Sequence, residues 1–221
     1  LEGFMRAAGV SFAQLHRTSD AKGEYFVARR EQQGEELSAH LATIVAQAVR
    51  RLPIQKVMRW GDSEHQFVRP VHSLVLLHGS RIVAGEVLGL VGGRTTIGHR
   101  FLSTGDIVIE RADDYAARLA AGKVIASFGD RRALIATQLE AAAAALGARI
   151  NPAAALLDEV TALVEWPVVY VGEFEAEFLE VPQECLILTM QQNQKYFPLL
   201  DAGGRLLNRF LIVANMQVDD P

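Results

Sequence analysis

Cysteine is almost absent from this sequence, because Cys185 is the only one among 221 residues. A single cysteine excludes a disulfide within the chain and a zinc site built on several cysteines. We expect Cys185 to be a small buried apolar residue on a helix, in a chain that works in a reducing cytoplasm. The sequence also lacks an apolar run of about 18 uncharged residues, which excludes a membrane-spanning helix.

Signals for targeting and for common catalytic sites are missing as well. The N-terminus has no initiator methionine and no basic region followed by an apolar run, so we expect a fragment whose start lies upstream and no secretory signal. The Gly-rich stretch 89–94 lacks the Lys-Ser or Lys-Thr ending of a phosphate-binding loop, and neither His-Glu-x-x-His nor Gly-x-Ser-x-Gly occurs. We therefore assign no catalytic residue, no metal site and no cofactor bound by this fragment.

The charge is unevenly distributed, although the net charge is only −4. Residues 50–100 carry eight basic side chains against three acidic ones, a local net charge of +5. Residues 151–184 carry eight acidic side chains and no Lys or Arg. A basic segment of this kind can form a local anion-attracting face even on an acidic protein.

The apolar pattern predicts helices and strands without strict alternation. Apolar residues at three-and-four spacing predict a helix from Glu35 to Leu52. Further helices are expected at 2–8, 113–121, 130–146 and 153–164 and from about Pro182, with Asp113 and Asp130 as N-caps and Gly122 and Gly147 as stops. Hairpins are expected at 12–17 with 24–29, at 73–78 with 81–88, and at 196–200 with 210–213, with further strands at 107–110 and 168–172.

These elements indicate an α+β fold, with a mixed, mainly antiparallel sheet and packed helices. The nearly continuous apolar run 73–78 indicates a strand that is central in a sheet. We expect one domain over 1–221, with a possible subdivision near residue 110, where strand-rich sequence gives way to helix-rich sequence.

Three segments, 56–72, 92–101 and 190–198, are rich in residues suited to RNA. In the first, cations alternate with Trp60 and Phe67, which can neutralise phosphates and stack on unpaired bases. The second combines glycines with donors, and the third combines Gln and Asn with a lysine. The alternative interpretations are aromatic side chains packed in a core, a solvated loop and a merely polar helix end.

The same segments resemble a known family, the β subunit of bacterial tetrameric glycyl-tRNA synthetase. The resemblance covers essentially the whole chain, in the family's order and at compatible spacing. It is carried by Lys56-Val-Met-Arg-Trp-Gly61, Phe67-Val-Arg-Pro-Val-His72, Gly93-Arg-Thr-Thr-Ile-Gly-His-Arg-Phe101, Asp158-Glu-Val-Thr-Ala-Leu-Val-Glu-Trp-Pro167 and Gln194-Lys-Tyr-Phe197.

The resemblance implies a cytoplasmic enzyme of α and β subunits that joins glycine to its tRNA, with ATP and Mg used by the holoenzyme. Glycine tRNA, the α subunit and a second β subunit are the implied partners, and no membrane is involved. The α subunit would activate glycine, so this fragment is expected to be inactive alone. The fold is expected to resemble the core domain of the phenylalanyl-tRNA synthetase β subunit, an analogy of fold alone.

We expect this region to contact the tRNA backbone and to support assembly. The predicted tRNA-binding residues are Lys56, Arg59, Trp60, Arg69, Arg94, His99, Arg100 and Lys195. One alternative is a subunit-interaction scaffold without tRNA contact, which would use the acidic stretch or the Gln-rich helix end. A remote alternative is an editing hydrolase of mischarged tRNA, for which His72, His99 and Glu165 are the candidate residues.

Overall fold

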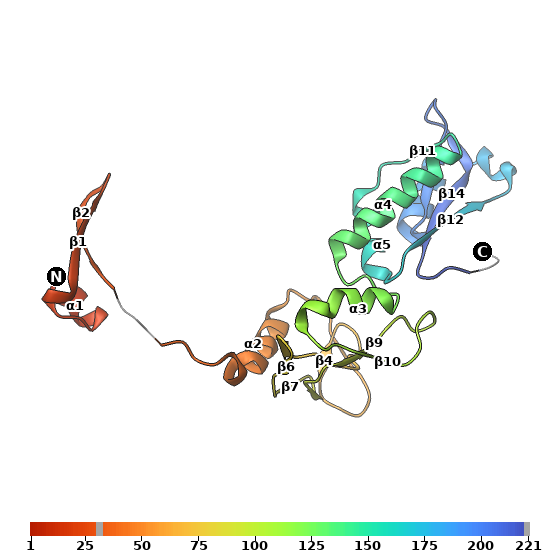
Figure 1. Ribbon diagram of the computed structural model, residues 1–221. Helices are drawn as coiled ribbons and strands as arrows, with labels where there is room; N and C mark the ends of the chain where they lie inside the picture. The colour runs from red at the N-terminus through yellow and green to blue at the C-terminus, as the bar shows by residue number, and fades with distance from the viewer. Residues whose placement is uncertain (30–32, 219–221) are drawn as a thin grey trace. The chain divides into compact units, whose positions relative to one another are not determined.

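The computed structural model describes residues 1–29 and 33–218. It divides into two compact units, Leu1–His40 and Leu41–Pro221. Six α-helices and several small antiparallel sheets lie within the described residues, which confirms a mixed α and β fold (Figure 1). The predicted single domain, with its possible subdivision near residue 110, stays a prediction. No helix in the described part of the chain has the length and apolarity needed to cross a membrane.

The first unit consists of one short helix and one hairpin. Helix α1 (Glu2–Ala8) ends at Gly9, whose φ of 65° is left-handed, as the sequence predicted. After the 3-10 helix η1 (Phe12–Gln14), strands β1 (Leu15–Asp20) and β2 (Gly23–Ala28) pair antiparallel, which confirms the first hairpin. No described residue of this unit is buried.

Helix α2 (Leu37–Arg51) confirms the helix predicted from Glu35 to Leu52. It is followed by four short antiparallel pairs of strands. They are β3 (Met58–Arg59) with β4 (Gln66–Phe67), β5 (Leu77–His78) with β6 (Arg81–Ile82), β7 (Glu86–Val87) with β8 (Leu90–Val91), and β9 (Thr95–Ile97) with β10 (Asp106–Val108). The β9 strand lies in a segment that we had interpreted as a loop, because its glycines conceal a short extended run.

The apolar run 73–78 forms backbone hydrogen bonds on both sides, although only Leu77 and His78 form a regular strand. Its Leu76 N–H donates to the Gly93 carbonyl at 3.0 Å, and its carbonyl accepts from Val83 N–H at 2.9 Å. Gly92 is needed beside it, because an added Cβ would lie 2.7 Å from a methyl carbon of Leu76. Leu76, Val83, Val87, Ile109 and Leu119 are buried in this part of the chain.

The remainder of the second unit is a four-stranded antiparallel sheet covered by helices, with strand order β11-β13-β14-β12. Its strands are β11 (Arg149–Ile150), β12 (Val168–Glu173), β13 (Phe197–Leu200) and β14 (Leu206–Ala214). Helices α4 (Phe128–Ala145) and α5 (Ala154–Leu163) pack on one face of the sheet (Figure 1). The core between them contains Ile135, Leu139, Val160, Phe197, Leu199 and Leu211.

Short helical elements connect these parts. They are η2 (Ala112–Asp114), α3 (Tyr115–Ala121), the 3-10 helix η3 (Ala176–Glu180), α6 (Gln183–Leu188) and the π-helix η4 (Thr189–Gln194). The stop at Gly122 is confirmed, and Gly147, with φ 62°, follows the end of α4.

Three local predictions were wrong. Ser127 caps α4 by accepting from the Asp130 N–H at 3.2 Å, so Asp130 itself lies inside the first turn. Asp113 lies within η2, and α3 has no side-chain cap. Cys185 is exposed, because α6 packs on the molecule through other residues, including the partly buried Leu186 and Ile187.

Candidate nucleic-acid interface

Residues 53–70 form a segment that we call the 53–70 loop. It begins where Pro53 prevents α2 from continuing. It contains the β3–β4 pair, in which Met58 lies opposite Phe67. Gly61 has a φ of 60°, which a turn between two such close strands can require. Arg59 Nη1 lies 2.5 Å from Glu64 Oε1 within this turn. The predicted irregular segment is therefore an ordered hairpin loop with one of its cations already paired.

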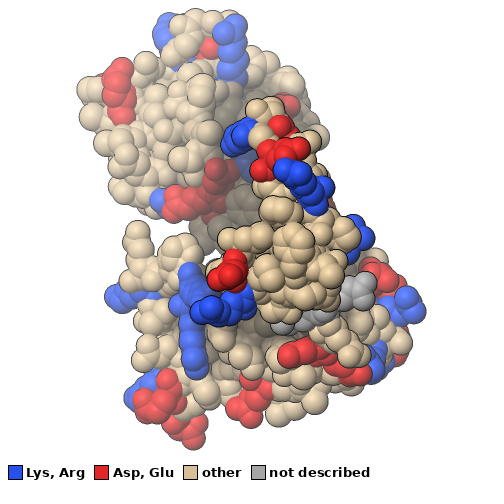
Figure 2. Space-filling view, turned by 90° about the vertical axis from the view of Figure 1, so that its left-hand side faces the viewer, with Lys and Arg blue, Asp and Glu red and all other residues tan. Residues whose placement is uncertain are grey.

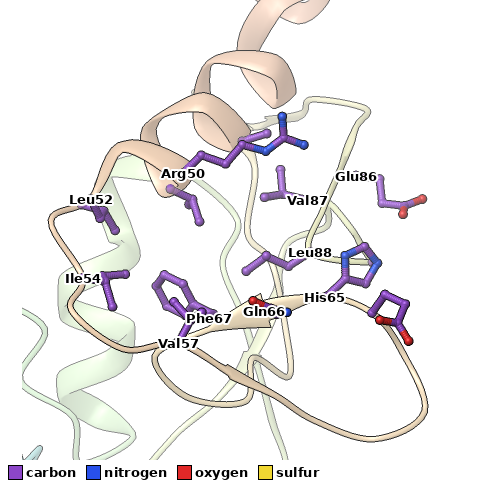
Figure 3. A pocket seen from close by; sticks show the side chains of 14 residues that line it. Arg50, Leu52, Ile54, Val57, His65, Gln66, Phe67, Glu86, Val87 and Leu88 are labelled. Carbon is purple, nitrogen blue, oxygen red and sulfur yellow. The ribbon is translucent and has the colours of Figure 1, made fainter.

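A cavity of about 600 Å³ lies between the end of α2, the 53–70 loop and the β7–β8 turn (Figure 3). Figure 3 shows Phe67 beside Ile54 and Val57, whereas His65 and Glu86 lie on the opposite side. Its apolar lining consists of Ala46, Val49, Leu52, Ile54, Val57, Phe67, Val87 and Leu88, and its remaining lining of Arg50, Glu64, His65, Gln66, Glu86 and Gly89. The volume lies within the usual range for small-molecule sites in proteins.

The composition of this cavity suits a flat group with polar edges. Phe67 offers an aromatic face, and the amide of Gln66 can both donate and accept hydrogen bonds. Gly89 has a φ of 76° and carries the turn close to His65, because an added Cβ would lie 2.7 Å from that ring. An unstacked nucleic-acid base has the matching shape and hydrogen-bonding edges.

Three of the predicted cations, Lys56, Arg69 and Arg100, are exposed and form no ion pair within residues 1–29 and 33–218. Two of them, Lys56 and Arg69, lie in the 53–70 loop on either side of the hairpin. Exposed cations without a carboxylate partner can bind phosphate without first breaking an ion pair. Trp60 is half-buried, so part of its ring packs against the protein.

Arg94 has a different environment from the one that we expected. Its Nη1 lies 2.6 Å from Glu110 Oε2, and its Nη2 donates to the Ser80 carbonyl at 3.0 Å. These two contacts link the start of β9 to the end of β10 and to the β5–β6 turn. The guanidinium therefore braces three segments of chain, and it is less available to phosphate than Lys56 or Arg69.

His99 was predicted to touch tRNA, but only 1% of its surface is exposed. Its Nδ1 accepts from the backbone N–H groups of Phe101 and Leu102, both at 3.2 Å. The side chain thus holds the turn after β9, and the prediction that it lies on a binding surface was wrong. A polar ring between Gly98 and Arg100 gave no signal of burial in the sequence.

Lys195 lies between η4 and β13, and not in the 53–70 loop. It follows the π-helix η4 with a left-handed φ of 61°, and its Nζ lies 2.8 Å from Glu159 Oε1 of α5. Of the eight predicted residues, His99 is therefore buried, and Arg59, Arg94 and Lys195 are held in ion pairs. On the face shown in Figure 2, Lys and Arg side chains occur in several groups with Asp and Glu side chains between them.

The editing alternative gains no geometric support. His72 and Glu165 are exposed, whereas His99 is buried and occupied by backbone hydrogen bonds. Glu165 is held through its main chain, whose N–H donates to Asn215 Oδ1 at 2.6 Å. Within the described ranges, no group of three or more His, Cys, Asp or Glu could hold a metal ion.

Sequence reasoning missed the residues that the β7–β8 turn contributes to the cavity, namely Glu86, Leu88 and Gly89. The signal for them was present, since glycine after Val87-Leu88 favours a tight hairpin turn. We had instead interpreted these glycines as part of an open glycine-rich loop.

Comparison with known proteins supports the resemblance noted from the sequence. The family described as glycyl-tRNA synthetase beta subunit matches residues 1–221. The chain is 58% identical over 222 residues to a protein of Neisseria meningitidis serogroup B named glycine--tRNA ligase beta subunit. Proteins of the same name from Aromatoleum aromaticum and Serratia proteamaculans are 55% and 44% identical, over 98% and 100% of this chain. The chain spans 32% of the length of each of these relatives. It therefore belongs to the glycyl-tRNA synthetase beta subunit family.

Proposed function

We propose that this chain is part of a cytoplasmic glycine–tRNA ligase and that its 53–70 loop contacts tRNA without activating glycine. Family membership supports the enzyme, because the relatives are named as ligase subunits. The observation that carries the contact is the pair of exposed cations, Lys56 and Arg69, which have no ion-pair partner among the described residues and lie on the loop that also lines the cavity. No residue of this region has a catalytic role in the proposal.

The local charge favours an anionic partner, although the whole chain is acidic. Residues 50–70 carry five basic side chains against two acidic ones, a net charge of +3. In this arrangement Lys56 and Arg69 neutralise phosphates, and a neighbouring unpaired base enters the cavity against Phe67. Base–aromatic stacking contributes about 1–3 kcal/mol per base in proteins that bind single strands.

The proposal extends to the whole enzyme of which this chain would form a part. Glycine tRNA, an α subunit and a second β subunit are its partners, and ATP and Mg are used by the complete ligase. A likeness of the fold to the core domain of the phenylalanyl-tRNA synthetase β subunit belongs to the same proposal.

The test is binding of glycine tRNA across a salt series. Each lost phosphate contact lowers the log–log salt slope by about 0.7–0.9. The double variant Lys56→Ala/Arg69→Ala should therefore bind more weakly, with a slope that is shallower by about 1.5. Arg149→Ala is the matched control, because Arg149 is an exposed cation on β11, outside the loop. Unchanged affinity and slope in the double variant would overturn the proposed contact.

A second function, a scaffold that binds another protein subunit, is favoured by a different surface. The η3–α6 surface, which we define as residues 175–188, exposes 48% of Phe178 and 40% of Leu179. Four exposed carboxylates lie in the same segment as these apolar groups, and none of them is ion-paired in the described part of the chain. They are Glu175, Glu177, Glu180 and Glu184. An apolar surface with carboxylates around it suits a basic, amphipathic segment of a partner.

Co-purification with the α subunit distinguishes the two functions. If this surface carries the scaffold role, Phe178→Ser/Leu179→Ser should lose the α subunit while retaining the binding of glycine tRNA. The Lys56→Ala/Arg69→Ala variant should show the opposite pattern. Retention of the α subunit by the Phe178→Ser/Leu179→Ser variant would reject the η3–α6 surface as the scaffold.

A further inference from the structure

A second cavity, of about 300 Å³, lies beside the π-helix η4 and the start of α5. Its lining combines small apolar groups with an amide, an ammonium and a carboxylate. The main lining residues are Ala153, Leu156, Glu159, Gln191, Gln192 and Lys195. It lies in the second unit, beside the Gln-rich segment 190–198, and none of its lining residues belongs to the 53–70 loop.

The backbone around this cavity is unusual. The π-helix η4 is one turn of a rare geometry that is frequently found at functional sites. It ends at Lys195, which has a φ of 61°. A glycine would adopt this conformation at no steric cost, whereas a side chain there costs roughly 1–2 kcal/mol. The backbone of Lys195 is therefore strained, and the Lys195 side chain brings an ammonium group to the cavity.

The ammonium of Lys195 retains a free donor. Its Nζ lies 2.8 Å from Glu159 Oε1 and donates to the Gln192 carbonyl at 2.8 Å. An ammonium has three N–H donors, so one remains for a ligand. The N-terminus of the ten-residue helix α5 also lines the cavity. Its N-cap residue, Ala153, has no polar side-chain atom that could accept a hydrogen bond from the first N–H groups of the helix. Both features favour a negatively charged group such as a phosphate, which has to share the ammonium with the Glu159 carboxylate.

Gln191 provides the second recognition element. Its Nε2 is buried and has no hydrogen-bond partner in the described part of the chain. An unpaired buried donor costs about 1–3 kcal/mol, so the side chain gains by rotating toward an acceptor in the adjoining cavity. A carboxamide presents a donor and an acceptor side by side, which matches the N6 and N7 edge of adenine.

We infer that this cavity binds an adenine nucleotide, with the phosphate at Lys195 and the base edge at Gln191. Ala153 and Leu156 provide the apolar wall for the ring. The ligand is a free nucleotide or one nucleotide of an RNA strand, since the two share this chemistry. The inference does not depend on the 53–70 loop, and variants of that loop should leave it unaffected.

The experiment is calorimetric titration of the 221-residue chain with AMP, UMP and inorganic phosphate. AMP should bind about tenfold more tightly than UMP, because only adenine offers the matching edge. A five-residue oligoadenylate is the fourth probe. Tighter binding of the oligoadenylate assigns the site to RNA, and tighter binding of AMP assigns it to a free nucleotide. Equal affinity for AMP, UMP and phosphate would overturn the inference.

Variants separate recognition from structure. Gln191→Leu should weaken AMP about tenfold while keeping or raising thermal stability, because it removes an unpaired buried amide. Gln194→Leu is the matched control, since Gln194 is exposed on the same π-helix and does not line the cavity. Lys195→Asn, in which Asn tolerates the left-handed backbone, should weaken AMP and phosphate alike.

If Gln191→Leu fails to fold, Gln191→Glu takes its place, because it keeps the shape of the side chain but replaces the amide donor with an acceptor. Binding of AMP that weakens more than binding of inorganic phosphate supports the inference. If the AMP affinity of Gln191→Leu is unchanged, Gln191 does not contact the ligand and the inference is abandoned. The same holds for an unchanged AMP affinity of Gln191→Glu, where Gln191→Leu does not fold.

Discussion

Gly172 of β12 faces an aromatic ring on the neighbouring strand, and adding a single methyl group there tests the packing of the sheet. Its register partner is Phe210 of β14. A Cβ built at Gly172 would lie 2.5 Å from two carbon atoms of the Phe210 ring. That ring cannot move freely, because it stacks on Tyr196 with ring centroids 4.6 Å apart. The ring of Phe174 also stacks on the Phe210 ring, with the two centroids 6.3 Å apart.

The expected cost of Gly172→Ala follows from two opposing effects. Inserting a methyl group into a packed site costs about 1–3 kcal/mol. Replacing glycine also lowers the entropy of the unfolded chain, which returns about 0.4–1 kcal/mol. The net loss in the free energy of unfolding is therefore about 1–2 kcal/mol. For a chain of this length, that loss lowers Tm by about 2–8 °C.

Thermal and urea unfolding followed by circular dichroism measure this change. The control is Gly129→Ala in α4, where the nearest atom to the added Cβ is Ser127 Oγ at 3.9 Å. That substitution should stabilise by up to about 1 kcal/mol, because alanine is the better helix former. Adding Phe210→Leu to Gly172→Ala should reduce the interaction penalty in a double-mutant cycle. If Gly172→Ala is as stable as the wild type, the close packing of Phe210 on β12 is wrong.

Two further predictions concern hydrogen bonds that hold turns. His99→Ala should cost about 2–4 kcal/mol in urea unfolding, because it opens a cavity and removes the acceptor for two backbone N–H groups. His99→Asn should recover part of that loss, since its Oδ1 can accept in place of Nδ1, and equal losses in both variants would argue against the hydrogen bonds. The pKa of Asp201 is lowered by the Arg205 backbone N–H, which donates to Oδ1 at 2.9 Å, and further by the Arg205 side chain. A lowered pKa adds stability that is complete above the unfolded-state pKa and is lost as the pH falls through the folded-state value. The wild type should therefore lose more stability than Asp201→Asn as the pH falls below about 4, measured by urea midpoints. A parallel pH dependence of the two proteins would contradict the role of Arg205.

The elements that were predicted correctly are those whose signals are local. Helix α2 repeats its apolar residues at helical spacing and stops before Pro53. The hairpin of β13 and β14 has a turn at 201–204 between two apolar runs, and Asp201 closes that turn. In such segments the residue order within a few positions carries most of the information, so no distant contact is needed to interpret it.

The sequence was least informative where a distant segment supplies the partner of a side chain. The sequence predicted Arg94 as a phosphate ligand, whereas in the structure its guanidinium is ion-paired with Glu110, sixteen residues away. Lys195 was predicted to bind tRNA, and the structure adds that its ion-pair partner, Glu159, comes from another helix. The π-helix before Lys195 had no sequence signal, because a π-turn differs from an α-turn by one residue in its hydrogen-bond spacing.

The sequence by itself determined the family, the mixed α and β composition and the basic character of the 53–70 loop. These depend on residue identity and on short-range periodicity. Only the tertiary structure decided which cations are free, that His99 is buried, and that Gln191, Lys195 and Glu159 meet at one cavity. Ion pairs, burial and cavities arise between residues far apart in the chain. The energy of each depends on distances of a few ångströms, which no local pattern specifies.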